Sequence, residues 1–136
     1  MSASPTIFDR QLLRIRQQRA RALGAETFLL DRIAAELGER LSAVLRQFER
    51  AVDLGTPTDA VRRVLAASGK VATIVAAEPA ATRLDAASLR VAADEEALPF
   101  ADGALDLVVS ALSLQFVNDL PGTLIQIRRA LKPDGL

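Results

Sequence analysis

The chain of 136 residues contains no cysteine, histidine, tyrosine or tryptophan. Without cysteine there is no disulfide, no thiolate nucleophile and no cysteine-bound zinc. Without histidine, imidazole-based catalytic triads and histidine-ligated metals are excluded as well. Acid–base chemistry must therefore use carboxylates, lysine or the substrate itself, and we expect no metal site.

An excess of one charge is also missing, because 17 basic side chains balance 17 acidic ones. Residues 1–50 hold nine arginines and six acids, whereas residues 51–136 hold eight basic side chains and eleven acids. This imbalance is too weak to predict a nucleic-acid partner, which would need a concentrated basic face. Arginine far outnumbers lysine, and alanine is abundant. That composition is typical of a GC-rich bacterial genome, so we expect a bacterial cytoplasmic protein.

Long apolar runs are absent too, since none reaches the roughly 18–20 residues of a transmembrane helix. The arginine-rich residues 1–24 fit a mitochondrial presequence in composition. We favour the alternative, an exposed helix with Leu12, Leu13 and Ile15 turned inward. A mitochondrial matrix location is accordingly the second choice.

What the sequence does contain is an alternation of helical and strand patterns. Half of the residues are hydrophobic, which predicts a packed core. Helices are predicted over 8–22 and 26–46, the second with an apolar stripe. The stripe consists of Phe28, Leu29, Ile33, Leu37, Leu41, Val44 and Leu45. Strands over 48–54, 71–77, 89–93 and 105–111 then alternate with helices over 59–67, 80–87 and 120–131. This order predicts an α/β fold with a parallel sheet (47–136) after a helical segment (1–46).

Ligands bind such sheets beyond the carboxyl ends of the strands, so the residues that follow each strand matter most. Glu78 lies 23 residues after Gly55, near the spacing at which dinucleotide folds place an acid on the ribose hydroxyls. The alternative is a solvated acid before Pro79. Asp94 and Glu95 follow the third predicted strand and would accept from an adenine amine; alternatively they form a charged loop. Strand 71–77 is almost wholly apolar, which predicts burial on both faces.

The loop after the first strand contains only the first of the glycines that nucleotide-binding loops use. Pro57 has no N–H to offer, and Asp59 would repel a phosphate. A pyrophosphate ligand such as NAD is therefore disfavoured. S-adenosylmethionine (SAM), whose methionine end carries an amine and a sulfonium, is better tolerated. Asp53 would favour that cationic end, or would simply order the turn.

These residues resemble class I SAM-dependent methyltransferases. The chain is more closely similar to bacterial relatives of the mitochondrial complex I assembly factor 5 family, and also to malonyl-carrier-protein methyltransferases. The resemblance is carried by residues 7–10, 53–55, 94–100, 105–110, 117–122 and 126–135. It implies a Rossmann-like sheet in strand order 3-2-1-4 with two N-terminal helices. The chain departs from the family at Pro57, at Asp59 and at Gln115-Phe116, where a His-Trp pair is usual, and the last three strands are absent.

The resemblance implies a role for each strand-end residue. Asp53 and Gly55 border the methionine end of SAM, Glu78 takes the ribose, Asp94 and Glu95 hold the adenine, and Ser110 lines the floor. The expected function is methyl transfer from SAM to an unidentified small-molecule, carrier-protein or protein substrate. The alternative is a catalytically degenerate assembly factor, or an arginine-hydroxylase-like protein of complex I assembly. We also expect self-association through the fourth strand, whose outer edge would lack a neighbour.

Overall fold

A parallel four-stranded sheet in the order β3-β2-β1-β4 forms the centre of the computed structural model, which describes residues 5–79 and 89–136. The strands are β1 (Phe48–Leu54), β2 (Val71–Glu78), β3 (Leu89–Ala92) and β4 (Leu107–Val109). The predicted α/β fold and strand order are confirmed. The predicted helix over 80–87 lies outside the described residues.

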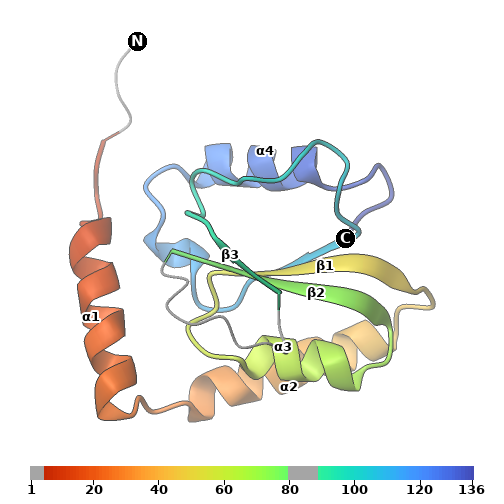
Figure 1. Ribbon diagram of the computed structural model, residues 1–136, viewed down its shortest axis with the longest axis horizontal. Helices are drawn as coiled ribbons and strands as arrows, with labels where there is room; N and C mark the ends of the chain where they lie inside the picture. The colour runs from red at the N-terminus through yellow and green to blue at the C-terminus, as the bar shows by residue number, and fades with distance from the viewer. Residues whose placement is uncertain (1–4, 80–88) are drawn as a thin grey trace.

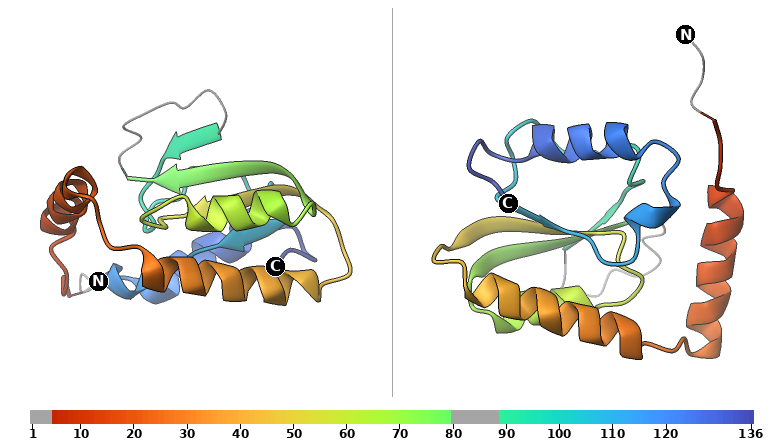
Figure 2. Two further views of the ribbon diagram at one scale, coloured as in Figure 1. Left: turned by 90° about the horizontal axis from the view of Figure 1, so that it is seen from below. Right: turned by 180° about the vertical axis from the view of Figure 1, so that it is seen from behind.

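Helices cover both faces of the sheet and one of its ends. Helices α2 (Phe28–Ser42) and α3 (Ala60–Ala67) lie on one face, and α4 (Leu120–Ala130) lies on the other (Figure 1). Helix α1 (Arg10–Leu23) runs across the carboxyl ends of the strands, nearly at right angles to them (Figures 1 and 2). Among the described residues, no helix is long and apolar enough to cross a membrane.

Each face of the sheet has its own apolar core. The core under α2 and α3 consists of Leu30, Ala34, Leu41, Phe48, Ala51, Ala60, Val61, Leu65, Leu107 and Ala111. The core under α4 consists of Val52, Leu54, Ala77, Ala93, Leu105 and Ala130. Successive residues of β1 supply both cores, because side chains alternate across a strand. β1 is therefore the central element that fixes both layers.

The predicted stripe of α2 is wrong in part. Phe28, Leu29 and Leu45 are exposed, and the residues that α2 buries are Leu30, Ala34 and Leu41. Close packing against α3 explains the rotation, because a Cβ on Gly38 would lie 2.5 Å from Cγ1 of Val64. Ala34 and Gly38 are small residues four positions apart, and they therefore lie on the side of α2 that faces α3.

Helix α2 also ends earlier than predicted, at Ser42 rather than at residue 46. The ammonium group of Lys70 explains this end. It donates hydrogen bonds to the carbonyl oxygens of Leu41 (2.9 Å), Ser42 (3.0 Å) and Val44. A lysine beside the last carbonyls of a helix satisfies groups that no further turn could satisfy.

The prediction that α1 is an exposed helix with Leu12, Leu13 and Ile15 turned inward is wrong for two of these residues, whereas Leu13 is half-buried beside the strand ends. Leu12 and Ile15 are 41% and 49% exposed, and α1 has no buried residue at all. The helix crosses the polar end of the sheet rather than an apolar face, so there is no core for these side chains to enter.

Two strands differ from their predicted form. β4 covers only Leu107–Val109, because Ser110 and Ala111 turn towards β1 and its loop. The Ser110 hydroxyl donates to the Leu54 carbonyl (2.8 Å), and the Ala111 N–H donates to the Thr56 hydroxyl (3.3 Å). In β2 only the last three residues are buried, so burial along the whole strand was wrong.

Candidate functional site

The predicted site residues meet at one end of the sheet. The register pairs Asp53 with Ala76 of β2 and with Val109 of β4, and it pairs Glu78 with Ala92 of β3. Asp94 and Glu95 follow β3 directly, and Ser110 follows β4. Parallel strands in this register necessarily bring their following residues to one edge. The sequence therefore predicted correctly that these residues share one end of the fold.

Asp53 is almost fully buried at the end of β1. Its carboxylate accepts a hydrogen bond from the Thr56 hydroxyl and lies 3.3 Å from a guanidinium nitrogen of Arg62 on α3. Burial raises the pKa of Asp53 to about 6 and outweighs Thr56 and Arg62, which lower it; the charge of Glu78 adds to the rise. A carboxylate so placed orders the loop that follows β1, which is the alternative role considered above.

Glu78 is held between two arginines. Its side chain is 7% exposed, and its two oxygens lie 3.2 Å from Arg21 of α1 and 3.2 Å from Arg90 of β3. The alternative of a solvated surface acid is therefore wrong. The two guanidinium groups replace part of the hydration that the carboxylate loses on burial.

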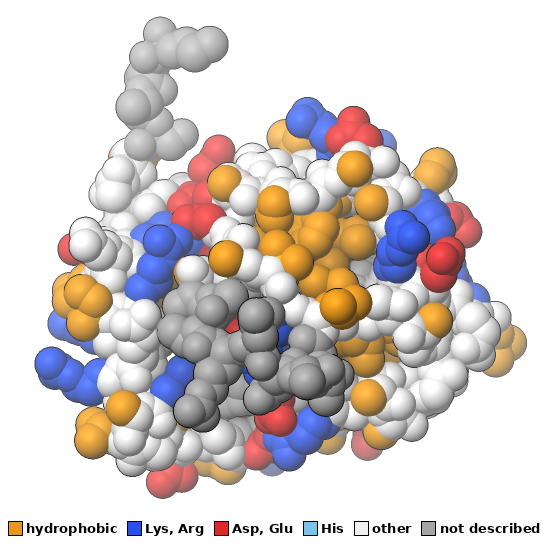
Figure 3. Space-filling model, in the orientation of Figure 1, with side chains coloured by type: hydrophobic (Ala, Val, Ile, Leu, Met, Phe, Trp, Pro, Cys, Tyr) orange, Lys and Arg blue, Asp and Glu red, His pale blue; other side chains and the backbone are white. Residues whose placement is uncertain are grey.

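The acidic loop after β3 binds the first turns of α1. Arg10 lies 2.9 Å from Asp94, 3.2 Å from Glu96, and in hydrogen-bond contact with Glu95. Arg14 also pairs with Asp94. Burial raises the pKa of Asp94, but the Glu96 N–H and the two arginines outweigh burial and hold this pKa below its usual range. Basic and acidic side chains accordingly lie together on the side where α1 runs (Figure 3).

Gly55 touches this acidic loop directly. It has a φ of +69°, and a Cβ there would lie 2.2 Å from the Ser113 hydroxyl and 2.4 Å from a carboxylate oxygen of Glu95. Ser113 in turn donates to Glu95 at 2.7 Å. Only glycine satisfies both the left-handed backbone and this close approach. The space that a side chain on residue 55 would need is thus occupied by Glu95 and Ser113.

Ser110 does not face the site as a free hydroxyl, because it donates to the Leu54 carbonyl. Two residues later, Leu112 has a φ of +54°, which is rare for a branched side chain. Strained backbone of this kind is held in place by its surroundings. Ser110 and Leu112 together turn the chain out of the sheet beside the loop after β1.

The sequence patterns did not predict the partners of the acids, chiefly Arg10, Arg14 and Arg21. The spacing of these arginines does carry some information. Steps of four and seven residues bring these three arginines to one face of a helix. That pattern predicts a basic stripe, but it cannot say which acids the stripe will meet.

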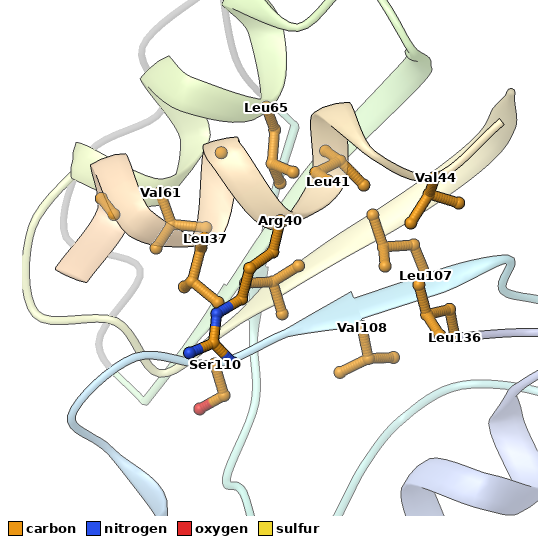
Figure 4. A pocket seen from close by; sticks show the side chains of 13 residues that line it. Leu37, Arg40, Leu41, Val44, Val61, Leu65, Leu107, Val108, Ser110 and Leu136 are labelled. Atoms are coloured by element: carbon orange, nitrogen blue, oxygen red, sulfur yellow. The ribbon is translucent and has the colours of Figure 1, made fainter. Parts of the chain in front are cut away.

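Two cavities adjoin α1 at this end of the sheet, as far as the structure describes the chain. A cavity of about 10 Å³ lies there among Arg10, Arg14, Glu95 and Ser113, enough for about one water molecule. A second cavity of about 230 Å³ adjoins it between α1, α2 and the loop containing Pro57. A third cavity, of about 320 Å³, lies apart, between α2 and the outer edge of β4 (Figure 4). Its lining is mostly leucine and valine, which does not suit a polar cofactor.

The chemistry of the strand-end residues fits SAM, whereas their present arrangement does not. Carboxylates can accept from ribose hydroxyls, an adenine amine and an ammonium group. Here those of Glu78, Asp94 and Glu95 are already paired with arginines of α1. Small-ligand sites usually offer about 300–1,000 Å³, more than either of the cavities of about 10 and 230 Å³ that lie beside α1 among the described residues. With α1 in this position, its arginines occupy carboxylate oxygens that SAM would use.

Known structures define the class of fold. A proposed SAM-dependent methyltransferase from Methanococcus maripaludis matches with a TM-score of 0.61 and 24% identity, over 99% of this chain and 64% of that one. The (4+2)-cyclase SpnF matches with a TM-score of 0.57 and 22% identity, over 76% of this chain and 42% of that one. The fold is that of class I SAM-dependent methyltransferases. The cyclase shows that this fold also carries other chemistry.

Sequence comparisons identify the family. A family model described as "Methyltransferase domain" matches residues 52–136. Rat mitochondrial arginine-hydroxylase NDUFAF5 is 38% identical over 99% of this chain and 43% of the relative. Malonyl-(acyl-carrier protein) O-methyltransferase from Gallionella capsiferriformans is 31% identical over 96% of this chain and 50% of the relative. The chain belongs to this methyltransferase domain family, and it spans about half of the length of these curated relatives.

The tight packing at Gly55 gives a first prediction. Gly55→Ala should lower the free energy of unfolding by more than about 1 kcal/mol through backbone strain, and further through the clash with Glu95 and Ser113. Gly69→Ala is the matched control, since Gly69 has a φ of +66° with nothing within 4 Å. Urea unfolding of both variants measures the difference. Equal losses would show that the contact with Glu95 and Ser113 does not matter.

The raised pKa of Asp53 gives a pH prediction. Its ordinary pKa of 3.8 rises to about 6 on folding, so folding favours the protonated carboxyl. That contribution to stability is complete below about pH 4 and is lost as the pH rises through about 6. Asp53→Asn cannot ionise. Its stability relative to the wild type should therefore increase by about 1–3 kcal/mol between about pH 4 and pH 7. Urea unfolding across this range is the measurement, and parallel profiles would contradict the prediction.

Proposed function

We propose that this chain forms the cofactor-binding part of a SAM-dependent methyltransferase. The observation that carries the proposal is the convergence of Asp53, Glu78, Asp94 and Glu95 at the carboxyl ends of adjoining strands. Family membership adds to it, because the matched region contains all four acids. When bound, SAM supplies an electrophilic methyl group.

The proposed roles follow the positions of the residues. Glu78, buried at the end of β2, would accept from both ribose hydroxyls. Asp94 and Glu95, at the end of β3, would hold the adenine. Asp53 and Gly55 would border the methionine end, where the buried negative charge of Asp53 favours an ammonium group. Ser110 would form the floor by keeping β4 and the loop after β1 together.

The chain's part in methyl transfer would be positioning. Alignment of a nucleophile with a methyl group needs little acid–base help, so a chain without histidine or cysteine is suited to it. The acceptor would be a small molecule, a carrier protein or another protein. We place the protein in the bacterial cytoplasm, on the strength of its arginine-rich, lysine-poor composition and its bacterial relatives.

A second candidate function is supported by the rat relative, which is named as an arginine-hydroxylase and matches nearly the whole chain. A protein of this kind would use the same fold without methyl transfer, as an arginine-hydroxylase-like protein or as a catalytically degenerate assembly factor for respiratory complex I. Isothermal titration with SAM, followed by an assay for S-adenosylhomocysteine release, separates the two. Binding without product release favours the second candidate.

Glu78 provides the sharpest test of the site. Glu78→Ala should weaken SAM binding by about 1–3 kcal/mol, because hydrogen bonds to a charged group are lost. Glu36→Ala is the control, since Glu36 is an exposed acid that pairs along α2 with Arg40. Titration calorimetry of both variants measures the effect. Unchanged SAM affinity in Glu78→Ala would remove Glu78 from the site.

The outer edge of β4 supports a prediction about self-association. The Leu136 carbonyl accepts a hydrogen bond there from the Val108 N–H (2.9 Å), and the Leu136 N–H donates to the Asp106 carbonyl (3.0 Å). The expectation that this edge lacks a neighbour is therefore wrong in part. The apolar cavity of Figure 4 lies along the same edge, with the Leu136 side chain 56% exposed beside it. Edges of this kind pair with further strands. We predict that the 136-residue chain dimerises or aggregates through this edge, as measured by light scattering against concentration.

A charge at the edge should oppose this association. Leu136→Lys should shift the chain towards monomer, because a lysine on an edge strand blocks further pairing. Leu45→Lys is the control, since Leu45 is 98% exposed and does not line the cavity. A wild-type chain that stays monomeric at all concentrations would contradict the prediction.

A further inference from the structure

Helix α1 is held on the molecule mainly by polar contacts. None of its residues is buried, and Leu12, Ile15 and Leu23 are 41%, 49% and 80% exposed. Helix α2, by comparison, buries three side chains in the core. Burial of apolar surface is the main force that fixes helices to a domain. Because α1 lacks that force, its position depends on its charged groups.

Those charged groups bind the carboxylates on which the proposed function depends. Arg10 and Arg14 pair with the acidic loop after β3, and Arg21 pairs with Glu78 after β2. Guanidinium groups and a ligand's hydroxyl or amine groups are donors that compete for the same oxygens. Each acid that is paired with α1 has fewer lone pairs to offer a ligand, and the cavity among Arg10, Arg14, Glu95 and Ser113 is only about 10 Å³.

The contacts of α1 also leave two of its buried hydrogen-bond donors without acceptors among the described residues. The Nε–H groups of Arg10 and Arg14 are buried and find no hydrogen-bond acceptor among the described residues. Arg10 Nε lies 3.2 Å from Glu96 as an ion pair, but without hydrogen-bond geometry. Buried donors without acceptors are unfavourable. The docked position of α1 therefore carries a cost that its release would remove.

The two ends of α1 differ in how they are attached. At its start, Asn118 accepts from the N–H groups of Ile7 and Phe8 at 2.8 Å, and the rings of Phe8 and Phe116 meet edge to face at 5.9 Å. At its end, Gly24 has a φ of +80° with open space around it, and α2 begins four residues later. Gly24 is a suitable pivot, because glycine adopts many backbone conformations. Movement there would leave α2 in the core (Figure 2).

We propose that α1 is an autoinhibitory strap, whose arginines occupy the carboxylates of the cofactor site so that a cofactor binds only after α1 has moved away. The inference rests on the proposed function, since it assigns these carboxylates to a cofactor. It predicts that α1 and a SAM-type ligand exclude one another. A helix that closed over a bound ligand would behave in the opposite way.

The test compares two double variants of the same helix in the whole chain. Arg10→Gln with Arg14→Gln removes two pairing charges, whereas Arg16→Gln with Arg19→Gln removes two exposed ones. S-adenosylhomocysteine is the probe, titrated by calorimetry, and hydrogen–deuterium exchange of residues 10–23 reports the position of α1. The first variant should exchange at least about tenfold faster in α1 and bind the probe about tenfold tighter than the wild type. The second variant should match the wild type. Adding the probe to the wild type should speed exchange in α1.

The possible results distinguish a failure of the autoinhibitory strap from a failure of the proposed cofactor-binding function. Equal affinity in all three proteins, or slower exchange of α1 on adding the probe, overturns the strap and leaves the proposed function standing. Faster exchange in the first variant without binding by any protein overturns both, because released carboxylates would then have no cofactor to bind.

Discussion

Opposite charges at the carboxyl end of the sheet are the interaction on which this structure depends. The end of a parallel sheet gathers the residues that follow each strand, and here three of the four strand ends carry acids. Acids so close together repel one another and lose hydration. Arginines must therefore approach them, and α1 supplies Arg10, Arg14 and Arg21. The position of α1, the closure of the site and the burial of Glu78 all follow from this need.

The sequence predicted the sheet well, because the sheet depends on local patterns. An apolar run bounded by turn residues defines β2 without knowledge of its neighbours. Strand ends and helix faces were predicted less well, because they depend on distant partners. Lys70 ends α2, Ser110 turns β4 towards Leu54, and Gly38 sets the face that α2 shows to α3. Each of these contacts has a partner in another segment, so the segment that it shapes does not specify it alone.

The candidate site likewise combines features that local patterns predict with features that depend on distant partners. Spacing and strand position were enough to bring Asp53, Glu78, Asp94 and Glu95 to one end of the sheet. Their partners were not predictable, because an arginine on one side of a helix gives no sign of the acid it will meet. Gly55 illustrates the limit. The sequence marked it as the start of a ligand loop, whereas the structure places Glu95 and Ser113 against it. Whether a residue faces a ligand or its own chain is decided by tertiary packing.

The central claim is that the acids at the strand ends form a cofactor site, which α1 covers. Backbone amide chemical shifts of the whole chain, recorded by NMR during titration with S-adenosylhomocysteine, test it most directly. The account predicts saturable shifts at Gly55, Glu78, Asp94 and Glu95, together with shifts throughout α1. Shifts confined to the apolar cavity beside β4, or no shifts at saturating concentration, would contradict it.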